Sequence, residues 1–145
     1  MTLMSFEWLT MRIGEERERR QREVTILALL PKGLEELHAT LADCVATYTA
    51  AFGAESAAIQ LGGGAIQVTV REKREKGWQP RAQVEVSTVA DPPAFLIRRG
   101  EESFSIEVGL LPGDKLYYRD SEEYLTVEEL TRRILDRALF PKLAE

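Results

Sequence analysis

The chain has 145 residues and a mass of 16.4 kDa, with 44% hydrophobic, 30% charged and 8% aromatic residues. These values are ordinary for one globular domain and exclude wholesale disorder, a collagen-like chain and a disulfide scaffold. The single cysteine, Cys44, cannot form an internal disulfide, and the single histidine, His38, cannot build a His-rich metal site.

The charge is spread unevenly along the chain. Residues 33–70 contain no Lys or Arg, whereas residues 71–81 contain five cations and two glutamates. The net charge of −5 disfavours a nucleic-acid partner, because nucleic-acid binders usually carry a broad basic surface. One local basic segment therefore lies in a mildly acidic protein.

The N-terminal residues do not resemble a secretory signal. Met1–Ile13 contains Glu7 and Arg12 and lacks an apolar central region. The longest apolar stretches are far shorter than the roughly 20 residues of a membrane span. We therefore expect a soluble cytoplasmic protein with no membrane partner, and the single free thiol agrees with a reducing compartment.

Residues 4–30 are predicted to be mainly helical, in three pieces. Met4–Ile13 is apolar on much of its circumference, residues 15–23 read EERERRQRE, and Val24–Leu30 is apolar again. A helical segment without apolar residues cannot lie against a core. We expect the charged run to be a solvated bridge between two buried ends, or the first helix to end at Gly14. The favourable i,i+4 pairs in this run are Glu15–Arg19, Glu16–Arg20 and Glu18–Arg22.

Residues 33–52 form the clearest predicted helix. Their apolar residues recur at steps of three and four, which corresponds to one stripe on a helix. Pro31 before this segment and Gly53 after it are typical start and stop signals. The stripe consists of Leu34, Leu37, Leu41, Val45, Tyr48 and Phe52.

From residue 57 onward, apolar and polar residues alternate, which predicts strands with one buried face. Ala57–Leu61 is the first expected strand, and Gly62–Gly64 supplies a hairpin after it. Short connections between successive strands favour an antiparallel meander over parallel βαβ units. Further strands are expected at residues 66–70, 82–86, 95–98 and 104–108, with a candidate sixth at 116–119.

Residues 127–140 are predicted to form the last helix. Thr126 at the N-cap and Glu129 three positions later make a capping box, and Leu125 and Leu130 occupy the positions of a hydrophobic staple. Pro141 follows as a stop signal.

These elements predict an α+β fold, in which helices pack on one face of a five- or six-stranded antiparallel meander sheet. The expected organisation is an N-terminal helical arm at residues 1–30 and a single α+β domain at residues 31–145. Many unrelated functions share such a layout, so the fold class alone does not indicate a function.

No motif for catalysis or metal binding is visible. The sequence contains no nucleophile elbow, P-loop, dinucleotide fingerprint or zinc motif. His38 and Cys44 are separated by about 240° around their predicted helix, so they cannot form a pair within it. We therefore name no catalytic residue, metal ligand or cofactor, and favour a protein that is not an enzyme.

Residues 71–81 form a basic segment between two predicted strands. A mixture of cations with an aromatic residue can hold single-stranded nucleic acid. The same residues also fit a soluble hairpin tip with the aromatic ring folded on the sheet edge, or a site for an acidic protein. The residues concerned are Lys73, Arg74, Lys76, Trp78 and Arg81.

The N-terminal arm is the stronger interaction candidate. It is rich in aromatic residues and methionine, and a large exposed apolar patch is unusual on a monomer. The patch could be covered by the same domain, by a second copy or by a different protein. Its residues are Met4, Phe6, Trp8, Leu9, Met11 and Ile13.

Our favoured hypothesis is a domain that acts through protein contact, as a homodimer formed by the arm. The first alternative is a small-molecule binder with an apolar pocket between the sheet and the helices. Nucleic-acid binding through the basic segment is the second. Tyrosines that could place polar groups in the pocket are Tyr48, Tyr117, Tyr118 and Tyr124.

Overall fold

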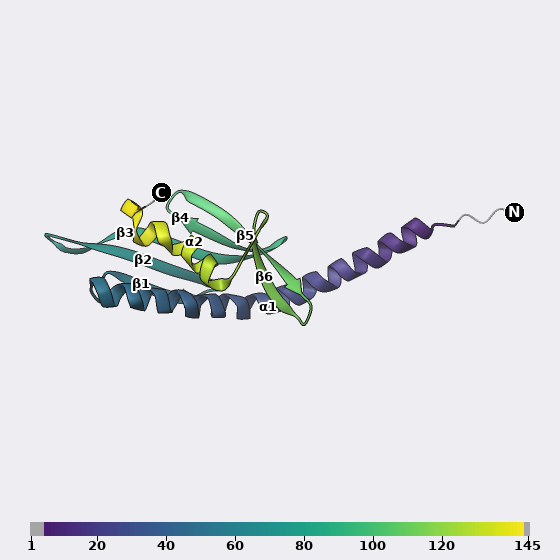
Figure 1. The fold of residues 1–145 in the computed structure, drawn as a ribbon, viewed down its shortest axis with the longest axis horizontal. Helices are drawn as coiled ribbons and strands as arrows, with labels where there is room; N and C mark the ends of the chain where they lie inside the picture. Colours follow the sequence, from purple (N-terminus) through teal and green to yellow (C-terminus); the bar gives the residue numbers. More distant parts are fainter. Residues whose placement is uncertain (1–4, 144–145) are drawn as a thin grey trace.

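The computed structural model describes residues 5–143. One long helix is followed along the chain by the strands of a single sheet and then by a second, shorter helix (Figure 1). The helices are α1 (Glu7–Phe52) and α2 (Val127–Leu139), followed by the 3-10 turn η1 (Pro141–Leu143). The strands are β1 (Ala57–Gly62), β2 (Ala65–Arg74), β3 (Gly77–Ala90), β4 (Pro93–Arg99), β5 (Glu102–Leu111), β6 (Lys115–Asp120) and β7 (Glu123–Leu125).

The sheet has seven strands in the order β1 to β7, and each strand is antiparallel to its neighbours. The α+β class and the antiparallel meander are confirmed, but the predicted count of five or six strands is wrong. The missed strand, β7, has only three residues, of which only Leu125 is buried. Three residues are too few to show an alternation that a sequence pattern could reveal.

The segment 71–81, predicted as a loop, is the end of a long β-hairpin. Strand β2 continues to Arg74 and β3 begins at Gly77, so the turn itself is very short. The pairing of β3 with β4 begins only at Val84, so the end of this hairpin is a two-stranded ribbon. Such a ribbon has no apolar alternation because it does not lie over the core.

The prediction that a helix starts after Pro31 is wrong, because helix α1 runs through this residue. A proline inside a helix removes one hydrogen bond and costs about 3 kcal/mol. Ile26 and Leu30 before the proline and Leu34 and Leu37 after it are all buried, and their burial offsets this cost. The two parts of α1 do not share one straight axis (Figure 1), as is usual at a proline.

Both helices pack on the same face of the sheet. Leu41 of α1 and Ile134 of α2 belong to a single core together with residues from the inner face of the strands. The opposite sheet face carries the polar residues that alternate with them. The fully buried core residues of the strands are Ile66, Val68, Val70, Val84, Val86, Phe95, Ile97 and Ile106.

Helix α2 is held at both ends. The predicted capping box is present: the Glu129 N–H donates to the Thr126 hydroxyl at 3.1 Å, and the Glu129 carboxylate accepts from the Thr126 N–H. Arg99 of β4 donates to the carbonyls of Arg133 and Ile134 in the middle of the helix. At the C-terminal end, Arg81 of β3 donates to the carbonyl of Leu139, the last residue of the helix. Cations suit this end because free carbonyls accumulate there.

Strand β6 crosses close to α1 at Gly33. A Cβ atom on Gly33 would lie 2.9 Å from Leu116 Cδ1, so a larger residue would require the Leu116 side chain to shift. The tyrosine hydroxyl of Tyr118 lies near the same point, at 3.4 Å from that Cβ position. Glycine weakens a helix interior by about 1 kcal/mol relative to alanine. At Gly33 this cost in helix stability is offset by the close packing of β6 on α1, which the missing side chain permits.

The N-terminal part of α1 projects away from the domain (Figure 1). Every residue from Ser5 to Arg22 is exposed except Glu16, which is half-buried. The expectation of a charged bridge between two buried ends is therefore wrong at its outer end. Only the inner end, from Ile26 onward, contributes buried residues to the core.

Candidate functional site

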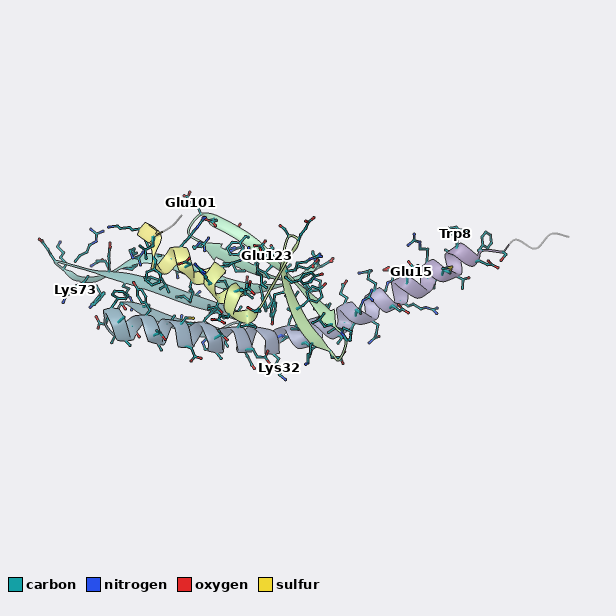
Figure 2. All side chains as sticks on the ribbon, viewed as in Figure 1. Trp8, Glu15, Lys32, Lys73, Glu101 and Glu123 are labelled. Atoms are coloured by element: carbon teal, nitrogen blue, oxygen red, sulfur yellow. The ribbon has the colours of Figure 1, made fainter. Side chains whose placement is uncertain are left out.

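The exposed arm carries the most conspicuous surface feature of the described residues. The side chains of Trp8 and Met11 are 65% and 67% exposed, and those of Phe6, Leu9 and Ile13 are also exposed. Figure 2 shows Trp8 near the far end of the arm, distant from the sheet. Met4, which was included in this patch, lies outside the described residues. The domain does not cover its own patch.

The apolar residues of the arm occupy two sides of the helix. Leu9 and Ile13 are four residues apart and share one side with Phe6, which is three residues before Leu9. Trp8 and Met11, three residues apart, lie on the opposite side at 100° per residue. A helix that is apolar on opposite sides is typical of one that is enclosed by other elements.

The charged run of the arm is stabilised by its own ion pairs. Arg12 pairs with Glu15 at 2.9 Å, and Arg19 contacts both Glu16 and Glu23. Hydrogen bonding from Arg19 lowers the pKa of the Glu16 carboxyl below its ordinary value. Of the predicted i,i+4 pairs, Arg20–Glu16 is present at 4.0 Å. These contacts keep the arm helical without a core beside it.

The basic hairpin already uses two of its arginines. Arg74 forms an ion pair with Glu72 of the same strand. Arg81 reaches across to the helix end and donates to the Leu139 carbonyl at 3.2 Å. Lys73, which is labelled in Figure 2, remains exposed near the hairpin tip, and Lys76 is also exposed.

Trp78 is half-buried and lies against the end of α1. A Cβ atom on Gly53 would lie 3.4 Å from the Trp78 ring. The ring therefore helps to attach the hairpin to the helix. Within residues 71–81, the half-buried Trp78 ring and the two engaged arginines leave only part of the free cation and open aromatic surface on which stacking with nucleic acid relies.

The four tyrosines do not share one pocket. Tyr118 is buried on the inner face, stacked on Phe95 with ring centroids 5.5 Å apart. Tyr117 and Tyr124 pack on each other at 5.3 Å on the outer face of the sheet. Tyr48 belongs to a different place, at the C-terminal end of α1. Side chains of the core fill most of the space between the layers, and of the four tyrosines Tyr118 lines a small cavity between α1 and β6.

An open apolar groove lies between the C-terminal ends of α1 and α2. It has a volume of about 630 Å³ and is lined by Cys44 and Tyr48 from α1 and by Phe140 after α2, among others. Tyr48 packs on both Phe52 and Phe140, with centroid distances of 4.9 and 5.7 Å. Burial raises the pKa of the Cys44 thiol, so the thiol is protonated near neutral pH and is a poor nucleophile.

Sequence reasoning missed this groove because its two sides come from opposite ends of the domain. A local signal existed in Phe52 and Phe140, two aromatic residues that each end a helix. Their meeting depends on how α1 and α2 pack side by side on the sheet.

Two further classes of site were tested in the structure. Among residues 5–143, no group of three or more His, Cys, Asp or Glu side chains is arranged to hold a metal ion. Within the same range, no helix is both long and apolar enough to cross a membrane.

Comparison with models of known families, with curated proteins and with solved structures finds no match for this chain. Of the surfaces described above, the arm combines exposed aromatic residues with a position away from the domain.

Proposed function

We propose that this protein acts through protein–protein contact and that the N-terminal arm joins it to a second copy of itself. The observation that carries the proposal is the apolar patch of Phe6, Trp8, Leu9, Met11 and Ile13, which is exposed on a projecting helix. Aromatic residues and Met are enriched at the centres of interfaces.

A second copy is the simplest partner for this surface. Each copy presents the same patch, so one contact removes apolar surface of both chains from water. Burial of apolar surface contributes roughly 25 cal/mol per Å². The contact would leave the core of each domain unchanged, because the described arm residues before Ile26 add nothing to that core.

The test is the oligomeric state of the full chain and of a chain lacking residues 1–23, measured by native mass spectrometry and light scattering. We expect the full chain to be a dimer at low micromolar concentration and the shortened chain to be a monomer with an intact sheet by circular dichroism. A full chain that is monomeric at all accessible concentrations would overturn the proposal.

Point variants test the same proposal without a deletion. We expect Trp8→Ala combined with Met11→Ala to weaken association at least about 10-fold, as truncated interface aromatics commonly do. Thr10→Ala is the matched control, because Thr10 is exposed on the same arm but is not apolar. Equal dimer affinities for both variants would contradict a role for the apolar patch.

A second candidate function rests on the groove between α1 and α2. Its volume of about 630 Å³ and its lining by Tyr48, Phe52 and Phe140 fit an apolar small molecule. The probe is the dye 8-anilinonaphthalene-1-sulfonate, whose fluorescence should rise on binding. Cys44→Trp should fill the groove and abolish this rise, whereas unchanged dye binding would contradict the proposal.

A further inference from the structure

Along the arm, apolar, acidic and basic residues follow one another in an order that is complementary to its own reverse. An apolar segment, residues 6–13, is followed by a mainly acidic run, residues 15–18, in which Arg17 is the one cation. A mainly basic run follows at residues 19–22, and Glu23 then precedes the apolar Val24. Read from the opposite direction, the order becomes apolar, basic, acidic, apolar. A second copy placed antiparallel therefore offers a basic segment opposite the acidic one.

We infer that two copies pair arm against arm in antiparallel orientation, with the centre of the pairing between Glu18 and Arg19. This inference rests on the proposed self-association and specifies its geometry. The segment from Glu7 to Glu23 contains five arginines and five glutamates, so it has no net charge that would attract a strongly acidic or basic partner. A partner that complements this segment needs a basic run opposite its acidic run and an acidic run opposite its basic run. A second, antiparallel copy of the arm has this order of charges.

A parallel pairing is disfavoured by the same charges. In a parallel pair, the acidic segment of one arm would lie beside the acidic segment of the other, and the basic segments would also meet. Like charges at helical neighbour distances destabilise a pair by about as much as opposite charges stabilise it. The antiparallel arrangement instead brings Glu15 level with Arg22 of the partner and Glu18 level with Arg19 of the partner, whereas Arg17 and Arg20, which meet as like charges, lie on another side of the helix.

The apolar residues also reach matching levels in this arrangement. Ile13 of one copy lies at the level of the exposed Val24 of the other, but both lie on the side of the helix opposite Trp8, outside a contact made through the Trp8 side. Trp8 lies at the level of Leu29. That residue lines a cavity of about 300 Å³ at the root of the arm, whose lining is partly apolar, as at Leu116, and partly charged: Lys32, Glu36, Asp114 and Lys115. Each arm tip therefore reaches the edge of the partner domain, where Leu29 and Leu116 offer apolar contacts beside charged residues.

The orientation is tested by spin-label distances in the full chain, with Cys44→Ser to remove the native thiol. Thr10→Cys and Gln21→Cys place labels at two exposed positions of the arm. At 1.5 Å per residue, antiparallel pairing separates the two Thr10 positions by about 25 Å along the arms and the two Gln21 positions by about 8 Å. A parallel pair would give short and equal distances at both positions.

The outcomes separate this inference from the proposed function. A long distance at position 10 with a short distance at position 21 supports the antiparallel pairing. Short distances at both positions, or long distances at both, would overturn it while the chain still self-associates. The absence of any distance between chains, with a monomeric mass, would instead overturn self-association itself.

Charge reversal gives a second, independent test. In the basic variant, Glu15, Glu16 and Glu18 become Arg; in the acidic variant, Arg19, Arg20 and Arg22 become Glu. We expect each variant alone to associate at least about 10-fold more weakly, and an equimolar mixture to form a heterodimer.

The chain that carries all six substitutions controls for loss of helix in the arm. It restores the ion pairs of position 16 with positions 19 and 20, although the pairs of Arg12 with position 15 and of Glu23 with position 19 are lost. Because it also restores the self-complementary order, it should regain the homodimer. Wild-type association of either single-sign variant would overturn the inference, as would failure of the mixture and of the six-substitution chain to associate.

Discussion

The part of α1 from Ile26 to Phe52 and the part from Glu7 to Thr25 belong to one continuous helix but are stabilised differently. The first presents an apolar stripe to the sheet, with Leu41 completely buried. The second has only ion pairs between neighbouring turns and ends in exposed apolar residues. Helix formation therefore depends on burial in one part and on local charge pairs in the other.

This difference shows how a helix can be both a structural element and an interaction surface. The domain part cannot change without loss of the core. The arm part can lose its apolar residues with little effect on the fold, so their presence calls for a partner outside the domain.

The largest expected effect comes from matched leucine truncations in the two parts. Leu41→Ala should lower the free energy of unfolding by about 2–5 kcal/mol, because it leaves a cavity in the core. Leu9→Ala should change it by less than about 0.5 kcal/mol under monomeric conditions. Urea denaturation measures both, and a comparable loss for Leu9→Ala would show that the arm packs on the domain after all.

Pro31 lies where the two parts of the helix join. Pro31→Ala should restore a donor for the Leu27 carbonyl and remove the ring clash. The helical penalty of proline, about 3 kcal/mol, is partly offset by the added freedom of the unfolded chain. We expect a net stabilisation of about 2 kcal/mol by urea denaturation. A destabilised variant would mean that the bend itself is needed for packing.

A smaller effect is expected from Tyr118 in the domain at alkaline pH. Burial, and the charge of Glu36 to a lesser extent, raises the pKa of Tyr118 above its ordinary value. The folded state therefore holds this proton more tightly, and the associated stability is lost as pH rises above about 10. The unfolding free energy of Tyr118→Phe should fall less steeply there than that of the wild type. Tyr124→Phe is the exposed control and should behave like the wild type.

The smallest effect is expected at low pH, where protonation of Glu16 should weaken the helix of the arm. The lowered pKa of Glu16 means that its stabilisation is present above the ordinary carboxyl pKa and is lost as pH falls through the lowered value. Far-UV circular dichroism should show a lower helix content at pH 3 than at pH 7. The chain lacking residues 1–23 should show a smaller change. Equal changes in both chains would place the acid-sensitive helix in the domain.

Much of the fold could be predicted from local sequence signals. Alternation at Ile66, Val68 and Val70 predicted a strand because the side-chain period of two leaves only one choice of buried face. Thr126 and Glu129 marked the start of α2 because a capping box satisfies backbone donors within a single turn. The arm was identified as the main candidate surface from its apolar residues alone.

Other features depend on contacts between distant segments. Pro31 is a stop signal by itself, yet the helix continues because Leu30 and Leu34 bury their side chains on both sides of it. Arg81 belonged to a basic segment in the sequence, but its partner is the Leu139 carbonyl, far along the chain. The predicted tyrosine pocket is not formed, since the four rings lie on different faces of the sheet and helices.

The sequence by itself therefore determined the periodicity of the strands, the limits of α2 and the chemical character of the arm, since each depends on residues within a few positions of one another. Only the tertiary structure decided that the arm stays uncovered, that α1 continues through Pro31 and that a groove forms beside Cys44. These outcomes depend on which surfaces of distant elements bury one another, and the free energy of that burial outweighs the local preferences.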